Sequence, residues 1–313
     1  MKIPKVKTKD IIDGTELSAK ETLALFDFTT ELKNDLRKGR KHEYLAKKSL
    51  AMIFEKNSTR TRVSFEAGIY QLGGQAIFLS GNDIQISRGE PLSDTAKVLS
   101  RYVDGIMIRT DKHEKAINLA KESNVPVING LTDMYHPCQA LADIFTIYER
   151  QKSFKNIKLT YLGDGNNVAH SLLIICSLLG VNISIASPKG YQPDSDVIAA
   201  AEKLAASSGS DLLITSDITK AVKGANYLYT DVWTSMGQEK EAVKRRKIFS
   251  SYRITRELLK KASPGCLVMH CLPAHRGEEI DADVIDSERS IIFDQAENRL
   301  HTQKAVMCAL MKK

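Results

Sequence analysis

The sequence is poor in cysteine, and the cysteines it has are scattered. Only five occur in 313 residues, an odd number with no Cys-x-x-Cys pair. This pattern excludes the disulfide framework of a small secreted protein, and no cluster of cysteine and histidine offers a structural zinc site. Free thiols indicate a reducing compartment, so we expect a cytoplasmic protein. The five are Cys138, Cys176, Cys266, Cys271 and Cys308.

Long apolar segments are also lacking. No run approaches the ~20 residues needed to span a bilayer, and residues 1–10 carry lysines without the apolar stretch of a secretory signal. We therefore expect no membrane partner. The net charge of +7 favours anionic partners. The lysines are nevertheless spread along the chain and no arginine-rich tail is present, so we expect no nucleic-acid partner. The densest basic run, Lys240–Lys247, is expected to be a solvated helix face.

What remains has the pattern of a two-domain α/β protein. A length of 313 residues suits two domains. Short apolar runs alternate with amphipathic stretches across short connections, which predicts mostly parallel sheets flanked by helices. We expect residues 1–144, with a C-terminal helix in 288–313 that packs back on them, to form one domain and residues 145–287 the other. The expected strands are residues 50–54, 75–79, 105–108, 125–129, 158–162, 182–186, 211–215, 227–231 and 267–270, with a last strand and helix in 291–311.

One segment, Ser58–Thr61, has the features of an anion-binding turn. Its sequence, Ser-Thr-Arg-Thr, follows an apolar strand, and either Asn57 or Ser58 is a good N-cap for the helix that comes next. The first turn of a helix has unpaired backbone N–H groups and the positive end of the helix dipole. Hydroxyls and a guanidinium at the same point predict a phosphate site. The alternative is an ordinary capped helix in which Arg62 pairs with Glu66.

Ligands of parallel sheets bind beyond the carboxyl ends of the strands, and this rule selects further candidates. His136 lies at a helix start with Pro137. It is expected to donate to a carbonyl oxygen or act as an acid, although a structural role is the alternative. The amide of Gln139 is suited to hold a planar amide-like group. These residues are therefore candidates for contact with a carbonyl oxygen or a planar amide-like group.

Two other candidates follow later strands. Asp231 ends a strand and precedes a loop through Gly237; it is expected to pair with an ammonium group or, alternatively, to form an Asx-turn. Cys271 follows a hydrophobic strand and is expected to lie in the cleft between the domains. It is a nucleophile, a polar neighbour of a substrate amine, or an inert core thiol. The sequence leaves these readings open.

The turn Gly163–Asn167 has some likeness to a nucleotide-binding turn. It follows a strand and opens a helix, but it lacks the third glycine of the dinucleotide motif. The next strand ends in Ala186-Ser187-Pro188, without an acidic residue to take a ribose hydroxyl. Dinucleotide binding is therefore disfavoured, and the two asparagines are candidates to bind a small polar substrate.

Together these motifs resemble the aspartate/ornithine carbamoyltransferase family, over nearly the whole chain. The Ser-Thr-Arg-Thr and His-Pro-x-Gln motifs are shared across carbamoyltransferases, whereas the Ser-Met-Gly and His-Cys-Leu-Pro motifs point to the members that act on ornithine. The motifs in order are Ser58–Thr61, His136–Gln139, Asp231–Gly237 and His270–Ala274.

The resemblance implies that the chain transfers the carbamoyl group of carbamoyl phosphate to the δ-amine of L-ornithine, giving citrulline and phosphate in arginine metabolism. It implies catalytic roles for Arg60, Arg109, His136, Asp231 and Cys271. It implies that carbamoyl phosphate contacts Ser58, Thr59, Arg60, Thr61, Gln85, Arg109, His136, Gln139, Cys271, Leu272 and Arg299. It implies that ornithine contacts Asn167, Asp231, Ser235 and Met236.

The resemblance also implies a homotrimer, or a multiple of trimers, in which the loop bearing Gln85 reaches into the site of a neighbouring subunit. Ser87 stands in this loop where the family pattern has glycine, which leaves the loop conformation open. The reaction requires neither a metal nor a redox cofactor, and the sequence has no motif for one, so we expect none.

Other functions remain as alternatives. Within the same class, the acceptor is another amine such as putrescine or a modified ornithine. From a different class, the chain is an NAD-dependent dehydrogenase, against which the incomplete glycine motif argues. The last alternative is a non-catalytic anion-binding or regulatory protein with the same fold.

Overall fold

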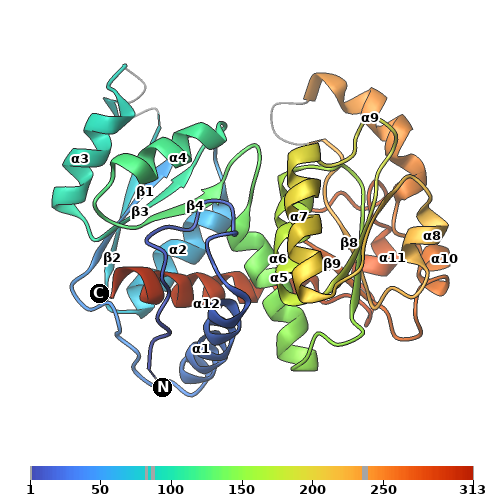
Figure 1. Ribbon diagram of the computed structural model, residues 1–313, viewed down its shortest axis with the longest axis horizontal. Coiled ribbons are helices and arrows are strands. Elements are labelled where there is room, and N and C mark those ends of the chain that lie inside the picture. The colour runs from blue at the N-terminus through green and yellow to red at the C-terminus, as the bar shows by residue number, and fades with distance from the viewer. Residues whose placement is uncertain (1, 82–83, 86–88, 235–238, 313) are drawn as a thin grey trace. The chain divides into compact units, whose positions relative to one another are not determined.

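The computed structural model describes residues 2–81, 84–85, 89–234 and 239–312, which form two compact units (Figure 1). Unit 1 comprises residues 1–145 and 298–313, and unit 2 comprises residues 146–297. Four residues named above lie outside the described residues: Ser87, Ser235, Met236 and Gly237. Each unit is built on one parallel sheet, which confirms the predicted fold class.

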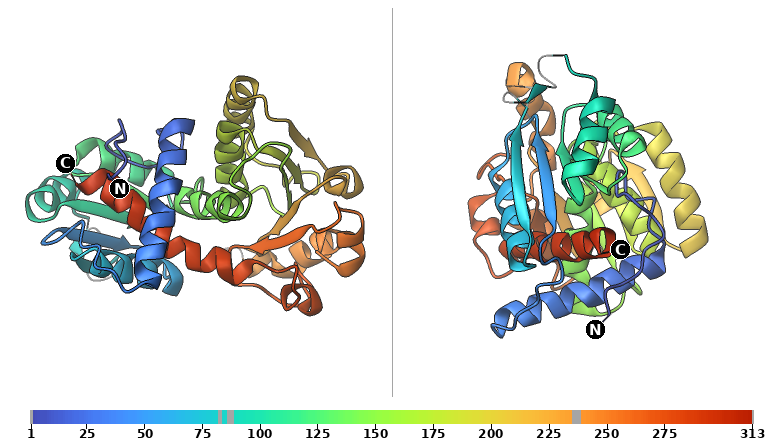
Figure 2. Two further views of the ribbon diagram at one scale, coloured as in Figure 1. Left: turned by 90° about the horizontal axis from the view of Figure 1, so that it is seen from below. Right: turned by 90° about the vertical axis from the view of Figure 1, so that its left-hand side faces the viewer.

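The sheet of unit 1 has four parallel strands in the order β2-β1-β3-β4. Helices cover both of its faces (Figure 2), as expected for parallel strands that are buried on both sides. Phe54 pairs with Arg109, so β1 and β3 end at the same edge. The elements are α1 (Ala19–Arg37), β1 (Ser49–Phe54), α2 (Thr59–Gln71), β2 (Gln75–Ser80), α3 (Leu92–Tyr102), β3 (Gly105–Arg109), α4 (His113–Glu122), β4 (Val127–Leu131) and the start of α5 (Pro137–Gln151).

The C-terminal helix, α12 (Ile292–Met311), packs against α1 and α2 of unit 1 through its residues from 298 onward. Lys33 Nζ on α1 donates to Asn298 Oδ1 at 2.6 Å. On α2, Gly68 permits a close approach, because a Cβ there would lie 3.1 Å from Met307 Cε and 3.3 Å from Lys304 Cγ. The predicted return of the chain end to the first domain is thus confirmed.

One expected element is wrong. The strand expected at the start of 291–311 is absent, and the chain makes only an isolated bridge between Val268 and Ser290 before α12 begins at Ile292. Ile291 and Ile292 are buried, so their apolar character reflects core packing of a helix start. A short apolar run does not by itself distinguish a strand from a buried helix segment.

The sheet of unit 2 has five parallel strands in the order β7-β6-β5-β8-β9. Thr230, at the end of β8, pairs with both Leu162 on β5 and His270 on β9, so these three strands also end at one edge. The elements are β5 (Lys158–Leu162), α6 (Asn167–Leu179), β6 (Asn182–Ala186), α7 (Ser195–Ser208), β7 (Leu212–Thr215), α8 (Ile218–Val222), β8 (Tyr227–Thr230), α9 (Ala242–Phe249), α10 (Arg256–Lys260), β9 (Leu267–His270) and α11 (Ala282–Ile285), with short 3-10 turns at Glu239–Glu241 and Ser250–Tyr252.

The basic run on α9 corrects a second expectation. The run was expected to be a solvated helix face, and Lys240, Lys244, Arg246 and Lys247 are indeed exposed, but Arg245 among them is buried, with 3% exposure. Its guanidinium carbon lies 5.0 Å from the ring centroid of Tyr191 and 5.1 Å from that of Phe249. Aromatic faces stabilise a buried guanidinium in a way that composition alone does not reveal.

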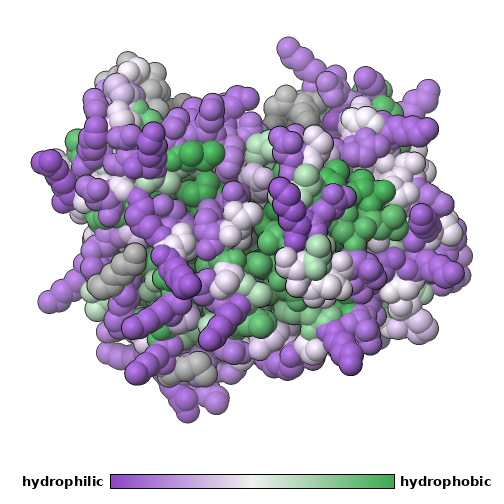
Figure 3. All heavy atoms as spheres, viewed as in Figure 1, coloured by the Kyte–Doolittle hydropathy of each residue, from purple (hydrophilic) through white to green (hydrophobic). Residues whose placement is uncertain are grey.

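Hydrophilic side chains are scattered over the visible face of each unit and do not gather in one block (Figure 3). Among the helices of the described residues, none combines the length and the apolar character that crossing a membrane requires.

Candidate functional site

The turn that the sequence predicts as an anion site lies shortly after β1, at the start of α2. Ser58, one of the two expected N-caps, has extended backbone angles, and its Oγ accepts a hydrogen bond from the N–H of Thr61 at 3.2 Å. α2 begins at Thr59, so its first turn presents backbone N–H groups at the edge where β1 and β3 end. The local geometry is that of an anion site at a helix N-terminus.

The two arginines of this turn have different environments. Arg62 Nε donates to Glu66 Oε1 at 3.0 Å, and its guanidinium lies 3.7 Å from the ring centroid of Phe78. The Arg62–Glu66 pair expected of an ordinary capped helix is therefore present as well. Arg60 is exposed and has no ion pair with a carboxylate within the described residues. Arg62 is committed to the helix surface, which leaves Arg60 as the arginine suited to a ligand.

Arg299 joins three segments that lie far apart in the sequence. Its Nη1 donates to Gln139 Oε1 at the start of α5, and its Nη2 donates to Thr61 Oγ1 at 3.4 Å. Gln139 in turn donates from Nε2 to Asp143 Oδ1 at 2.7 Å. These four side chains are buried. The structure thus brings the predicted residues Thr61, Gln139 and Arg299 together in unit 1.

Positive charge is concentrated at the same place. Burial, with the charges of Arg299 and Arg60, lowers the pKa of Arg109 to about 10. Burial, with the charges of Arg299 and Arg109, holds the pKa of His136 well below its usual 6.5. His136 is therefore a neutral imidazole at physiological pH. Because like charges repel, such a buried group of cations is costly unless an anion completes it.

Glu55 ties together the two strand ends that lead to this group. Its Oε2 accepts a hydrogen bond from Thr110 Oγ1, directly after β3, and one from Lys115 Nζ at 2.8 Å. Its backbone N–H donates to the carbonyl of Arg109 at 2.9 Å. Glu55 follows β1 and precedes Ser58 by three residues. One carboxylate therefore holds the segment that carries Arg109 against the segment that leads to Ser58.

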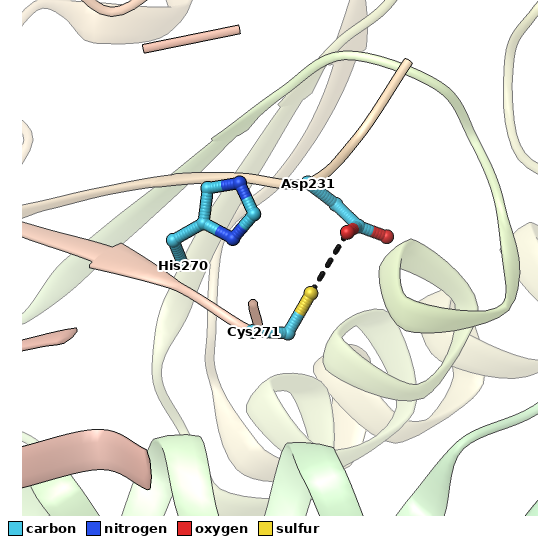
Figure 4. Close-up of side chains that lie close together, drawn as sticks. All are labelled: Asp231, His270 and Cys271. Atoms are coloured by element: carbon cyan, nitrogen blue, oxygen red, sulfur yellow. Dashed lines mark hydrogen bonds between the residues drawn. The ribbon is translucent and has the colours of Figure 1, made fainter. Parts of the chain in front are cut away.

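Unit 2 has a site of opposite character around Asp231, which follows β8. Asp231 is buried, and its Oδ2 accepts from Asn166 Nδ2 at 2.8 Å. Its Oδ1 accepts from Cys271 Sγ at 2.8 Å, the bond drawn in Figure 4, and from the N–H of Val232 at 2.8 Å. Asp231 thus has tertiary partners from two other strand ends besides its local bond, which is more than a turn residue needs.

His270 lies beside this pair in Figure 4, but its ring is engaged elsewhere. Its Nδ1 accepts from the N–H of Leu272 at 2.8 Å, so the ring proton is on Nε2, which donates to Glu279 Oε1 at 3.0 Å. The nearest ligand atoms of Asp231, His270 and Cys271 lie within 4.8 Å of one another. Because neither nitrogen of His270 keeps a free lone pair, this trio is not arranged as a metal site.

The other predicted residues are placed as follows. Leu272 has φ of 59°, a left-handed conformation that is unusual for leucine and is held by its bond to His270. Asn167 is the first residue of α6. Gln85 is exposed, and within the described residues no hydrogen bond joins its side chain to the groups around Arg299.

The glycine turn after β5 has a structural explanation. Gly163 has φ of 140°, and a Cβ on Gly165 would lie 2.2 Å from the backbone nitrogen of Pro193. Gly165 N–H also donates to the carbonyl of Tyr191 at 2.8 Å. Both glycines are therefore required by the path of the chain, which removes the main reason to expect a dinucleotide.

Comparisons with known proteins agree with this geometry. Residues 9–149 match the family model for the carbamoyl-P binding domain of aspartate/ornithine carbamoyltransferases, and residues 155–310 match the model for the Asp/Orn binding domain. The chain belongs to the aspartate/ornithine carbamoyltransferase family.

Individual members of the family are similar along almost their whole length. The ornithine carbamoyltransferase of Thermococcus kodakarensis is 54% identical, with 94% of this chain and 97% of that protein covered. That of Bacillus cereus is 50% identical, with 100% and 97% covered. The solved structure of ornithine carbamoyltransferase from Pyrococcus furiosus is 51% identical and superimposes with a TM-score of 0.94, covering 97% of each chain.

For a carbamoyltransferase of this family, several residues of interest were missed by the sequence motifs. Glu55 directly follows an apolar strand, so the rule that ligands gather at strand ends would have selected it. Asn166 was considered only as a ligand candidate, whereas it is the N-cap of α6 and a partner of Asp231. Glu279 and Arg245 gave no signal, because their roles depend on partners distant in the sequence.

Proposed function

We propose that this chain transfers the carbamoyl group of carbamoyl phosphate to the δ-amine of L-ornithine, which gives L-citrulline and phosphate in arginine metabolism. The observation that carries the proposal is the opposite charge of the two sites. Unit 1 gathers buried cations around Arg109 and Arg299, whereas unit 2 offers the buried carboxylate of Asp231. Carbamoyl phosphate is an anion and ornithine carries ammonium groups, so each substrate has a complementary site.

Unit 1 supplies the carbamoyl phosphate half of the reaction. The phosphate accepts hydrogen bonds from the first turn of α2, from Ser58 to Thr61, and is neutralised by Arg60 and Arg109. Arg109 Nε is buried and finds no hydrogen-bond partner within the described residues, as expected of a donor that an anionic ligand completes. Arg299 and Gln139 hold one another in place beside the carbamoyl group.

His136 acts in this proposal as a neutral donor to the carbamoyl oxygen. Its depressed pKa favours the neutral donor over the acid among the roles that the sequence left open. A neutral imidazole still donates one N–H, and donors placed where charge develops stabilise an oxyanion without reorganisation. Arg109 is the second donor.

Unit 2 supplies the ornithine half. Asp231 accepts from the α-ammonium group of ornithine, and Asn167, Ser235 and Met236 contact the rest of the amino-acid part. Cys271, which donates to Asp231, and Leu272 lie at the reacting end of the substrate. The thiol serves here as a polar neighbour of the amine, because its proton is directed at the Asp231 carboxylate and both nitrogens of the adjacent His270 are already engaged.

The chemistry is a direct displacement. The neutral δ-amine attacks the carbamoyl carbon, a C–N bond forms, and the C–O bond to phosphate breaks. Phosphate leaves with the bonding electron pair and takes up the proton that the nitrogen loses. The rate depends on dispersed positive charge at the phosphate and on holding the reactants in near-attack geometry.

The assembly and the compartment are part of the same proposal. We infer a homotrimer, or a multiple of trimers, in which the loop bearing Gln85 completes the site of a neighbouring subunit. The exposure of Gln85 supports this role. The free cysteines support the cytoplasm. Light scattering after size exclusion measures the mass, and a monomer with full activity would contradict the shared site.

The test of the activity is an assay of phosphate release with carbamoyl phosphate and a panel of amines. We expect release and citrulline with L-ornithine, and little with putrescine or L-aspartate. A preference for putrescine would replace the proposed acceptor. Absence of release with every amine, from a protein that binds carbamoyl phosphate, would favour the non-catalytic alternative.

A further inference from the structure

Arg245 is a buried cation of unit 2 that no motif includes. It lies on α9 within the basic run 240–247, yet only 3% of it is exposed. Its neighbour Arg246, by contrast, has a half-exposed side chain that pairs with Glu278 at 2.9 Å. Burying a guanidinium costs free energy unless its donors are satisfied. The partners of Arg245 therefore show what the buried charge is for.

Two partners come from the two loops that carry the proposed ornithine residues. Arg245 Nη2 donates to Asp164 Oδ2, in the loop between β5 and α6 that ends at Asn167. Arg245 Nε donates to the carbonyl of Trp233, two residues after Asp231. The side chains of Arg245 and Asp164 are 4% and 12% exposed, so water does not compete with this pair.

The guanidinium is fixed in position by aromatic rings. It lies over Tyr191 and Phe249, and Phe249 also stacks on Trp233 with 6.1 Å between ring centroids. A planar cation with two directed N–H groups and two aromatic neighbours has little freedom to move. It therefore sets the distance between its two hydrogen-bond acceptors.

The same two loops meet a second time at Asp231. Asn166 Nδ2 donates to Asp231 Oδ2 at 2.8 Å, so the loop after β5 contacts the loop after β8 directly. The loops are thus connected both by the Asn166 bond and by the Arg245 bridge. Without the bridge, the Asn166 bond to the Asp231 carboxylate would still join the two loops, but Asp164 and the Trp233 carbonyl would no longer share one donor.

We propose that Arg245 is a positioning residue for ornithine, holding the loop of Asn167 and the loop of Asp231 at the separation that the amino-acid part of the substrate requires. This inference rests on the proposed function, because it assigns ornithine to these two loops. It predicts that loss of the bridge weakens the use of ornithine and spares carbamoyl phosphate, whose residues belong to unit 1.

The principal test compares Arg245→Gln with Arg246→Gln. Arg245→Gln should raise the KM for ornithine by about 3- to 30-fold, the range in which changes along a packed network alter coupling, and leave the KM for carbamoyl phosphate within about twofold of the unchanged protein. Arg246→Gln removes a charge one residue away at the surface and should alter neither. Equal KM values for ornithine in the two variants would overturn the proposal.

A second pair of variants separates positioning from stability. Arg245→Gln leaves the Asp164 carboxylate buried without its cation, so the melting temperature should fall. Adding Asp164→Asn removes that charge, and the double variant should recover stability. Its KM for ornithine should stay raised, because the Trp233 carbonyl is still not held. Recovery of the KM together with stability would show a purely structural role and would overturn the proposal.

Trp233 provides an optical readout, since it is the one tryptophan of the sequence. Arg245→Gln should shift its fluorescence emission to longer wavelength, because the segment loses its anchor and admits water. An unchanged spectrum would contradict the anchoring. Failure of the inference is distinct from failure of the proposed function: in the first case the unchanged protein makes citrulline and only the variants behave otherwise than expected, and in the second it makes none.

Discussion

The two units have the same architecture at the strand ends but opposite electrostatics. In unit 1 the environment disfavours further positive charge. Burial and nearby arginines lower the pKa values of both Arg109 and His136. In unit 2 the groups disfavour further negative charge: burial, with Asp231 and Asp164, holds the pKa of Tyr161 well above 10. A parallel sheet therefore fixes where a ligand binds, and the residues after each strand fix its charge.

The units also differ in how their loops are held. In unit 1 a carboxylate, Glu55, binds Thr110 and Lys115. In unit 2 a guanidinium, Arg245, binds Asp164 and the Trp233 carbonyl. The residue that holds the loops therefore has the opposite charge to the site: Glu55 is an anion in the cationic unit 1, and Arg245 is a cation in unit 2, where Asp231 is the candidate ligand group. In unit 2, burial raises the pKa of Asp164 to about 6, and the charge of Arg245 opposes that rise.

The largest expected effect is that of Arg60→Ala. Arg60 is exposed, so its loss should leave the fold and melting temperature unchanged, while the loss of transition-state charge stabilisation should lower kcat by roughly 100- to 1000-fold. Arg62→Gln is the matched control, because Arg62 is engaged with Glu66, and it should lose only a few-fold. If both variants kept their rates in the phosphate-release assay, unit 1 would not be the phosphate site.

Asp231→Asn tests the opposite site. The substitution keeps the shape and removes the charge, so the KM for ornithine should rise by roughly 30-fold or more, as for other buried charge partners. The affinity for carbamoyl phosphate, measured by calorimetry without ornithine, should stay the same. A loss of carbamoyl phosphate affinity in this variant would break the division of charge between the units.

Glu55→Gln tests whether Glu55 holds the loops of unit 1 in place for carbamoyl phosphate. The amide removes the charge that holds Lys115 and should raise the KM for carbamoyl phosphate about tenfold, since a hydrogen bond to a charged group contributes about 1.5–3 kcal/mol. Asp111→Asn is the control, because Asp111 is a second, more exposed partner of Lys115 at 3.1 Å. Similar steady-state kinetics for the two variants would remove Glu55 from the phosphate half.

The smallest effect on activity is expected from Lys304→Met, which tests a cation of unit 1 outside the site. Burial lowers the pKa of Lys304 to about 8. His42 must donate from Nδ1 to the Arg40 carbonyl, so its Nε2 accepts from Lys304, at 3.2 Å. Between pH 8 and about 10.5 the unfolded chain binds more protons than the folded one, so the free energy of unfolding should rise with pH.

Chemical denaturation across that range measures the rise. Lys304→Met should abolish the part of this rise that Lys304 causes, up to about 3 kcal/mol of unfolding free energy, and leave citrulline formation unchanged. Lys312→Met, at an exposed position, should preserve the rise. If the free energy of unfolding had the same pH dependence in all three proteins, the pKa of Lys304 would not be lowered by folding.

Much of this was readable in the sequence. The strands of residues 158–162, 182–186 and 267–270 were predicted to the residue, because a buried parallel strand is a short apolar run between polar connections. Ser58 was one of two adjacent residues, with Asn57, that the sequence offered as the cap, from their type and from the apolar run before them. These features are local, and local patterns carry them. The terminal strand was predicted wrongly because the same pattern also fits a buried helix start.

The tertiary structure decided which distant residues contact and support the motif residues. Arg299 reaches Thr61 across 238 residues, and Arg245, which the sequence placed on a solvated face, is buried over Asp164. Hydrogen-bond partners and burial depend on which segments meet, and no window of sequence contains that. The sequence by itself therefore determined the order of the elements and the residue types at the strand ends, while only the fold decided which charges are buried, which pKa values shift, and which side chains hold the two sites in shape.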